Sequence, residues 1–198
     1  MDIKHRILKE AGIMFSRYGI KSVTMEYIAN ELGISKRTIY EKFNDKDELI
    51  MQAVEEGSKS HKKMCFDIIN KSNNIVDAMF KITKLNSRVF QKINPLFFED
   101  LKKYYPQINN KIAEKGSIRD YSLSGSLLNR GMEEGIIRND LNIEVVNIFI
   151  HKCIDIVNSN EFAEINKEDI RNSVFIPYLV GVSTDKGRKL IETQLNNF

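Results

Sequence analysis

The sequence TMEYIANELGISKRTIYEKFNDK, residues 24–46, decides the fold of this chain because it predicts two short helices joined by a tight turn. Thr24 can cap the first helix, since a threonine oxygen accepts a free backbone N–H at a helix start. Ile28, Ala29 and Leu32 then fall on one side of that helix, at the spacing of an amphipathic helix. The segment therefore has one face to bury and one to expose.

A turn of only about three residues follows this first helix. Gly33 ends the helix, because glycine adopts the left-handed backbone conformation of a helix C-terminus at little cost. Ser35, two residues later, can accept a backbone N–H at the start of the next helix. Two helices joined in this way form a helix-turn-helix, whose second helix enters the major groove of DNA in many proteins.

The second helix, residues 36–43, is expected to bury little and expose much. Ile39 and Phe43, four residues apart, form its one apolar row. The other side is polar and suits a polyanion, and it carries Lys36, Arg37, Tyr40 and Glu41.

The side chains of this exposed face match chemical groups of DNA. Arg37 can donate two parallel hydrogen bonds to guanine O6 and N7, and Thr38 offers a hydroxyl and a methyl group. Tyr40 can donate a hydrogen bond to a phosphate oxygen. Glu41 either accepts a hydrogen bond from a cytosine amino group or lies at the edge, where phosphate repels it. We therefore predict that this helix contacts DNA.

A third helix is predicted to start directly after the helix-turn-helix. Asp45 and Glu48 have the spacing of a capping box, and Lys46 in the first turn can reach a phosphate. The helical pattern continues into Ile69, with Gly57 weakening the helix by up to about 1 kcal/mol. Such a helix would be a rigid connector between the two halves of the chain.

These residues match a known family, because the region from Ile7 through Val54 resembles the DNA-binding domain of the TetR/AcrR transcriptional regulators. The resemblance implies that Tyr40 and Lys46 hold phosphates and that Ser35 to Thr38 face bases or backbone. Arg37 stands where that family often has glycine or a small residue, so its base contact is inferred from its own chemistry. The residues that carry the resemblance are Ala11, Phe15, Gly19, Thr24, Ile28, Ala29, Gly33, Ser35, Tyr40, Phe43, Lys46, Leu49 and Ile50.

The charge of the chain does not by itself identify a nucleic-acid binder. The 198 residues include 30 basic and 27 acidic side chains, a net charge of +3, and residues 1–50 carry nine basic and eight acidic ones. The placement of the basic residues must therefore supply the attraction to phosphate. The residues predicted to contact double-stranded operator DNA are Thr24, Ser35, Lys36, Arg37, Thr38, Tyr40 and Lys46.

The rest of the chain has a helical pattern, so the predicted fold class is all-α. We expect two domains: a helix-turn-helix DNA-binding domain at residues 1–46, and a helical ligand-binding and dimerisation domain at residues 47–198. No strand-length alternation competes with the helical runs, which end near Asn73, Ile93, Tyr105, Ile137, Asn158 and Thr184.

Two late helices are apolar on more than one side. They occupy residues 143–157 and 174–182, and in the second Pro177 predicts a kink and Gly181 allows close backbone approach. They are either central helices of one subunit or the interface of a dimer. The segment from Phe175 to Gly187 resembles the end of TetR-like chains, whose final two helices form a four-helix dimer interface. The predicted interface residues of a homodimer are Phe149, Cys153, Phe175, Tyr178 and Leu179.

The middle of the chain is rich in methionine and aromatic residues, which can line a cavity for an apolar or amphipathic small molecule. Most such side chains serve only as core in a helical domain. His151 and Asp155, four residues apart, either give a cavity one polar group or form a local hydrogen bond. The predicted ligand-binding residues are Met64, Phe97, Phe98, Tyr121 and His151.

The sequence lacks the motifs of common enzyme and cofactor sites. It has no HExxH, GxSxG, P-loop or GxGxxG motif, and its three histidines are scattered. Cys65 and Cys153 form no CxxC pair, and no apolar run approaches the ~18 residues that span a bilayer. We therefore expect no catalytic residue, cofactor or metal, no membrane contact, and a cytoplasmic location.

Together these observations predict a ligand-responsive transcriptional regulator of TetR-like architecture, a homodimeric repressor released from its operator by an unknown small-molecule effector. The alternative is a helical small-molecule-binding or assembly protein without sequence-specific DNA binding. The basic and hydroxyl residues from Lys36 to Tyr40 favour the regulator, and salt-dependent binding to a chromosomal fragment distinguishes the two.

Overall fold

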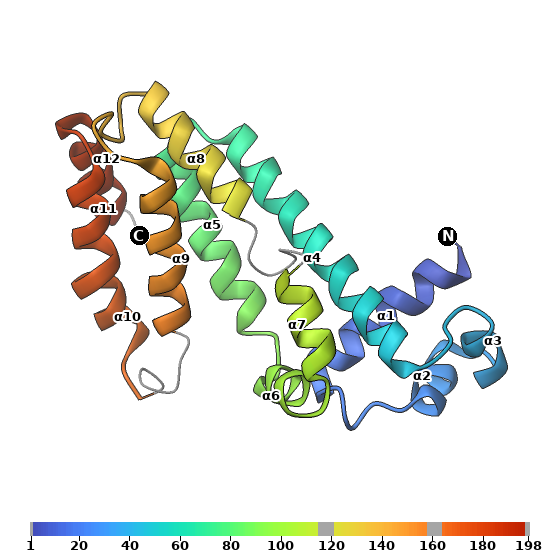
Figure 1. Cartoon of the computed structure of the whole chain (residues 1–198). Helices are drawn as coiled ribbons and strands as arrows, with labels where there is room; N and C mark the ends of the chain where they lie inside the picture. Colours follow the sequence, from blue (N-terminus) through green and yellow to red (C-terminus); the bar gives the residue numbers. More distant parts are fainter. Residues whose placement is uncertain (1, 115–120, 158–163, 197–198) are drawn as a thin grey trace. The chain divides into compact units, whose positions relative to one another are not determined.

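Helices build the chain in this computed structural model, which describes residues 2–114, 121–157 and 164–196 (Figure 1). No strand occurs in these ranges, where Ile137 and Ser183 form one isolated bridge. The all-α prediction is therefore confirmed. The helices are α1 (Ile3–Tyr18), α2 (Met25–Leu32), α3 (Lys36–Tyr40), α4 (Lys46–Lys71), α5 (Ile75–Phe90), α6 (Pro95–Tyr104), α7 (Pro106–Glu114), α8 (Tyr121–Glu133), α9 (Ile143–Val157), α10 (Lys167–Ile170), a π-helical turn (Arg171–Phe175), α11 (Ile176–Val182) and α12 (Asp185–Leu195).

The chain divides into two units that do not follow a single cut in the sequence. The first unit comprises Met1–Met64 and Lys84–Ile118, and the second comprises Cys65–Thr83 and Arg119–Phe198. The first unit thus joins the helix-turn-helix to α6 and α7, and both α4 and α5 pass from one unit into the other. The expected domain boundary between residues 46 and 47 stays a prediction.

The first unit has a core to which one face of each early helix contributes. In α1, Ile7, Ala11 and Phe15 lie four residues apart and are fully buried. Helices α6 and α7 add Leu101 and Ile108 to the same core. Burying one large side chain such as that of Phe15 contributes about 1.5–3 kcal/mol, so this core holds α1 to α3 firmly in place.

The second unit has its own core, centred on α5, α8 and the segment that follows α8. Ile75, Ile136, Ile137 and Ile191 are buried to 1% exposure or less. At Gly131 on α8 a Cβ atom would lie 2.6 Å from the side chains of Ile137 and Ile75. Glycine is therefore required there, because any side chain would separate α8 from its neighbours.

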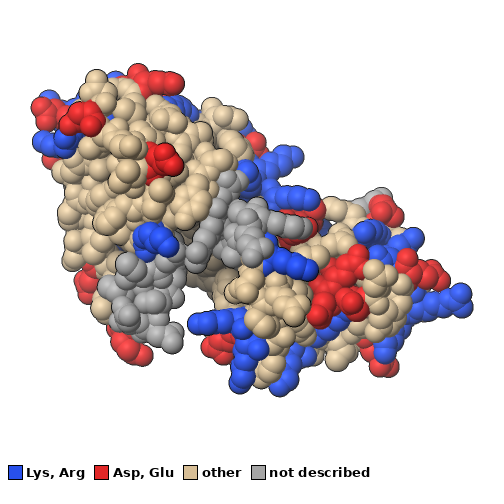
Figure 2. Space-filling view, viewed as in Figure 1, with Lys and Arg blue, Asp and Glu red and all other residues tan. Residues whose placement is uncertain are grey.

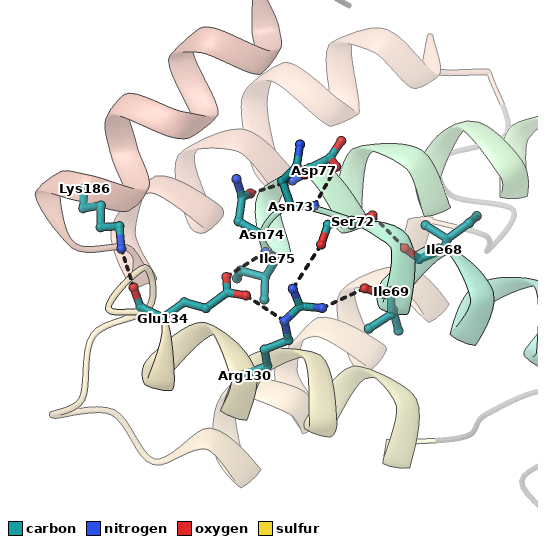
Figure 3. Close-up of polar contacts among 10 residues, drawn as sticks. All are labelled: Ile68, Ile69, Ser72, Asn73, Asn74, Ile75, Asp77, Arg130, Glu134 and Lys186. Atoms are coloured by element: carbon teal, nitrogen blue, oxygen red, sulfur yellow. Dashed lines mark hydrogen bonds and ion pairs between the residues drawn. The ribbon is translucent and has the colours of Figure 1, made fainter.

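A polar network in the second unit joins the ends of α4, α5 and α8 (Figure 3). Arg130 on α8 donates to the carbonyl oxygens of Ile69, at 2.7 Å, and Ser72, at 3.1 Å. Arg130 Nε also donates to Glu134 Oε1 at 2.6 Å, and Glu134 Oε2 accepts the backbone N–H of Ile75 at 2.9 Å. These side chains satisfy carbonyls at the end of α4 and the first amide of α5, which no intrahelical partner can reach.

The predicted helical runs differ from the structure at two places. The run predicted between Tyr105 and Ile137 contains two helices, α7 and α8, and Pro106 opens α7, where its missing N–H costs nothing because the first amides of a helix have no intrahelical acceptor. The last run is predicted to end near Thr184, yet the Thr184 hydroxyl oxygen accepts the N–H of Gly187 at 3.2 Å and so caps a further helix, α12. A π-helical turn, Arg171–Phe175, lies directly before α11, and the kink expected at Pro177 stays a prediction.

None of the helices in the described ranges combines the length and apolarity that crossing a membrane requires.

Candidate nucleic-acid interface

The helix-turn-helix has the capping geometry that its sequence predicted. The Thr24 hydroxyl oxygen accepts the N–H of Tyr27 at 3.0 Å and starts α2. Gly33 ends α2 with a φ of 64°, in the left-handed region. The Ser35 hydroxyl oxygen accepts the N–H of Thr38 at 3.1 Å and starts α3. Each cap contributes about 1 kcal/mol and fixes where its helix begins.

The inner face of the helix-turn-helix is buried as the sequence predicted. Ile28 and Ile39 are fully buried, and Phe43 is 1% exposed. Ala29 and Leu32 from α2 belong to the same core. The exposed face of α3 is therefore presented on a fixed framework, which is what a surface needs to match the shape of DNA.

The outer face of α3 is available to a large partner. Lys36 is exposed, the Arg37 side chain is 88% exposed, and Tyr40 is 46% exposed. Thr38 is half-buried, with its hydroxyl 2.9 Å from the hydroxyl of Ser35. On the side shown in Figure 2, the first unit carries both basic and acidic side chains.

Glu41 has a role that the sequence left open. Arg37 Nε donates to Glu41 Oε1 at 3.1 Å, one turn along the chain, and both side chains are more than half exposed. An exposed pair of this kind is worth at most about 1 kcal/mol. Arg37 can therefore exchange Glu41 for guanine or phosphate at little cost.

Lys46 and Tyr40, the two predicted phosphate ligands, have different surroundings. The Tyr40 side chain is exposed. Lys46 is half-buried, and its Nζ donates to the carbonyl oxygen of Ile20 at 2.7 Å. Burial lowers the pKa of the Lys46 ammonium, although Asp100 and Asp47 act in the opposite direction. The Lys46 ammonium thus has a partner within the chain, which the sequence did not predict.

The predicted ligand-binding residues are distributed over both units. Met64, Phe97 and Phe98 belong to the first unit, where Met64 and Phe98 are 40% and 44% exposed and Phe97 packs against the core. The rings of Phe97 and Phe98 lie 5.2 Å apart. Tyr121 and His151 belong to the second unit. A single pocket formed by all five stays a prediction.

His151 belongs to a polar group between α8 and α9. Its ring lies 4.3 Å from the ring of Tyr121, and its Nε2 lies 2.8 Å from the hydroxyl of Ser124. Ser124 donates to the Oδ1 of buried Asn147 at 2.7 Å, and Asn147 Nδ2 donates to the carbonyl of Tyr121 at 2.8 Å. The sequence did not show this group, because its members come from two helices. The Asp155 side chain, the other predicted partner of His151, lies outside the described residues.

Two clefts lie elsewhere, one in each unit, and none of the predicted ligand-binding residues lines either of them. The cleft in the second unit has a volume of about 320 Å³ and is lined by Asn73, Asn74, Glu134, Ile136, Lys186 and Leu190. The cleft in the first unit has a volume of about 530 Å³ and is lined by Asp45, Asp47, Glu48, Met51, Tyr104, Tyr105, Pro106, Gln107, Ile108 and Lys111.

Helix α9 presents an apolar surface away from its own core. Val146 is buried in the second core, whereas Val145, Ile148 and Phe149 are 60%, 45% and 51% exposed. The Phe149 ring lies 5.1 Å from the ring of Tyr178 on α11. Three other predicted interface residues are half-buried: Cys153, Phe175 and Leu179.

Comparison with known proteins agrees with this geometry. Residues 7–53 match the family model of the bacterial regulatory proteins of the tetR family. The uncharacterised HTH-type transcriptional regulator YvaF of Bacillus subtilis (strain 168) is 28% identical over 155 residues, which cover 77% of this chain and 78% of that protein.

Two solved structures share the fold over nearly the whole chain. The fatty acid degradation regulator FadR from Bacillus halodurans superposes with a TM-score of 0.68 at 17% identity, covering 92% of this chain and 97% of that chain. A structure from Mesorhizobium loti MAFF303099, described as a TetR-family transcriptional regulator, gives a TM-score of 0.67 at 18% identity, covering 91% of this chain and 96% of that chain.

A capped helix-turn-helix on a buried framework, followed by a helical domain, defines the class of DNA-binding transcriptional regulators. Within that class, the chain resembles the TetR family of bacterial regulatory proteins, whose family model its residues 7–53 match. The resemblance from Ile7 through Val54 is thereby confirmed.

Proposed function

We propose that this TetR-like regulator binds a palindromic operator as a homodimer and acts as a repressor, which a small molecule releases from DNA. The exposed face of α3, carried on two capped helices, is the observation that supports operator binding most directly. Arg37 reads a guanine, and Lys36 and Tyr40 contact phosphates. Thr24, Ser35 and Thr38 carry hydroxyls at the starts of α2 and α3 and contact the backbone or a base beside them.

Selection of bound fragments from the source genome tests this function. The wild-type protein should enrich one sequence with two symmetric half-sites, whose centres lie at least about one helical turn, or roughly 34–36 Å, apart. Its affinity should fall steeply with salt, because phosphate contacts release counterions. Enrichment of no sequence over random DNA would contradict operator binding. The genes beside the site would indicate the chemistry of the effector.

The homodimer rests on the apolar surface of α9 and α11. Val145, Ile148 and Phe149 are exposed although apolar, and Figure 2 shows a broad, largely uncharged face on the second unit. In α11, none of the described atoms lies close to the position of a Cβ at Gly181, so a second helix can approach its backbone. Joining two copies through this surface removes these side chains from water and gives the assembly a two-fold axis.

Phe149→Glu tests the dimer against a matched control. Sedimentation at micromolar concentration should show a dimeric wild type and a monomeric Phe149→Glu protein, because a charge cannot be buried unpaired at an interface. Phe90 in the first unit is 54% exposed, close to the 51% of Phe149. Phe90→Glu should remain dimeric. A monomeric wild type, or equal dissociation of both variants, would contradict the proposed interface.

The effector that we propose is an apolar or amphipathic small molecule. In the first unit its contacts would come from the aromatic side chains of Phe97 and Phe98 on α6, with Met64 on α4. The ligand releases the protein from DNA only if it binds the conformation that cannot bind DNA more tightly than the conformation that can. The coupling is then reciprocal: operator DNA should lower the affinity of the protein for the ligand by the same factor, about 5- to 150-fold for typical couplings.

A further inference from the structure

One peptide group in the loop between α1 and α2 is bound at both of its polar atoms by side chains from other helices. The N–H of Lys21 donates to Asp100 Oδ2 at 2.7 Å. The carbonyl oxygen of Ile20, on the other side of the same peptide bond, accepts a hydrogen bond from Lys46 Nζ at 2.7 Å. Because the peptide is trans, these two atoms point in opposite directions, and the two side chains hold the group from opposite sides.

Asp100 on α6 is a buried carboxylate, with 8% of the residue exposed. Gly19 lets α6 approach the loop this closely, since a Cβ atom there would lie 3.1 Å from Asp100 Oδ2 and 3.1 Å from the Cβ of Leu96. Gly19 also has a φ of 83°, which side-chain-bearing residues rarely adopt. A buried carboxylate is costly unless it is hydrogen-bonded, so the Lys21 amide accounts for the position of Asp100.

Helix α6 contacts the same part of the chain at both of its ends. At its start, the N–H of Asn94 donates to the Ser16 carbonyl at 2.8 Å, and Asn94 Nδ2 donates to the Arg17 carbonyl at 3.2 Å. At its end, Lys21 Nζ donates to the Tyr104 hydroxyl at 3.3 Å. The peptide group of Ile20 and Lys21 is therefore the centre of a continuous contact between α6 and the end of α1.

The bound peptide group lies directly before the first helix of the helix-turn-helix. Only three residues separate Lys21 from Met25, where α2 starts. Within this short connection Val23 is 1% exposed, and the side chain of Ile20 is fully buried. A shift of the peptide group would therefore displace α2 and also α3, which a tight turn joins to α2.

We propose that Asp100 and Lys46 are positioning residues for DNA binding: they hold the Ile20–Lys21 peptide group and so set the placement of α2 and α3. The proposal rests on the DNA-binding role of α3 given above. It assigns Asp100, which lies outside residues 7–53, to the recognition apparatus. It also assigns the Lys46 ammonium to the loop carbonyl and not to a phosphate.

The test measures DNA affinity and its salt dependence for Asp100→Ala, Asp100→Asn and Lys46→Ala, at a temperature where each variant is folded. Asp100→Ala should lower affinity for the selected site by about tenfold, which corresponds to the loss of one charge-assisted hydrogen bond. Its log–log salt slope should equal that of the wild type, because no phosphate contact is lost. Asp100→Asn should recover most of the affinity, since an amide oxygen still accepts the Lys21 N–H.

Lys46→Ala separates positioning from a phosphate contact. A positioning role predicts weaker binding with an unchanged salt slope, whereas loss of a phosphate contact reduces the slope by about one. A reduced slope would overturn the assignment of Lys46. Amide hydrogen exchange at Lys21 supplies a readout without DNA, and it should accelerate in Asp100→Ala but not in Asp100→Asn.

Asp77→Ala is the matched control for buried carboxylates. Asp77 is 9% exposed, and it too accepts a backbone N–H, that of Asn73 at 3.2 Å, but in the second unit. Asp77→Ala should destabilise the protein and leave the DNA affinity of the folded form unchanged. The proposal fails if Asp77→Ala weakens DNA binding as much as Asp100→Ala, or if Asp100→Ala binds like the wild type. If the wild type itself binds no DNA specifically, the proposed operator binding is contradicted. Amide hydrogen exchange at Lys21 then still tests whether Asp100 holds the loop.

Discussion

The two ends of α4 are fixed in different ways. At its start, the N–H of Glu48 donates to Asp45 Oδ1 at 2.7 Å, and the N–H of Asn44 donates to Glu48 Oε2 at 2.8 Å, so residues next to one another in the sequence close the end. At its other end, Arg130 on α8 binds the carbonyls of Ile69 and Ser72 from about 60 residues away. The start is a local cap, and the end is held by tertiary contacts.

Because of this difference, we expect substitutions at the two ends of α4 to affect different properties of the protein. The cap at the start is exposed and replaceable by water, but Lys46 in the same turn connects it to the loop before α2. Arg130 and Glu134 are only 31% and 22% exposed, so their loss cannot be compensated by water in the same way. We expect substitutions at the far end to change stability and substitutions at the near end to change DNA binding.

Arg130→Ala has the largest expected effect on stability. It leaves two carbonyls and the Glu134 carboxylate without the guanidinium, and the free energy of unfolding should fall by about 3 kcal/mol. Urea unfolding measures this change. Arg138→Ala is the control, because the Arg138–Asp140 pair is 41% and 60% exposed and should contribute much less to stability. If both variants lose the same free energy of unfolding, the contacts of Arg130 stabilise the protein no more than an exposed ion pair does.

Asp45→Ala tests the near end and should have a smaller effect. The N-cap of α4 is lost, and the free energy of unfolding should fall by about 1 kcal/mol. Asp47→Ala, in the same turn, should cost less, because no backbone amide of the described residues donates to the Asp47 side chain. A loss as large as that of Arg130→Ala would show that the two ends of α4 are held equally strongly.

Gly57→Ala should have the smallest effect and the opposite sign. Gly57 lies in the middle of α4, and a Cβ atom there would meet nothing within 4 Å among the described residues. Alanine should therefore raise the free energy of unfolding by about 0.5–1 kcal/mol. If the substitution destabilises the protein or weakens DNA binding, the flexibility of α4 at this point has a function.

The sequence predicted local structure well and long-range contacts poorly. Thr24, Ser35 and Asp45 could be assigned as caps because each accepts an N–H only three residues away. The contact between Asp100 and Lys21 joins residues 79 apart, so no local pattern indicates it. The sequence likewise does not show that Lys46, in the first turn of α4, is half-buried and bound to the Ile20 carbonyl.

The same limit applies to the helices and to the ligand site. Helix α12 was not predicted, because the last helical run was expected to end near Thr184, although threonine also begins helices. The ligand-binding residues were predicted from their chemical type, which does not distinguish residues of the core from residues that line a cavity. The contact of His151 with Ser124 depends on how α8 and α9 pack, which the sequence does not show.

The affinity of Arg37→Ala for the selected operator and for random DNA of equal length tests the central claim most directly. If α3 reads DNA through Arg37, the variant should lose about 1–3 kcal/mol on the operator, with relaxed preference at one base pair per half-site, and much less on random DNA. Lys102→Ala, which removes one exposed charge from α6, should leave the ratio of the two affinities unchanged. Equal weakening of operator and random DNA by Arg37→Ala would contradict the claim that α3 reads the sequence through this residue.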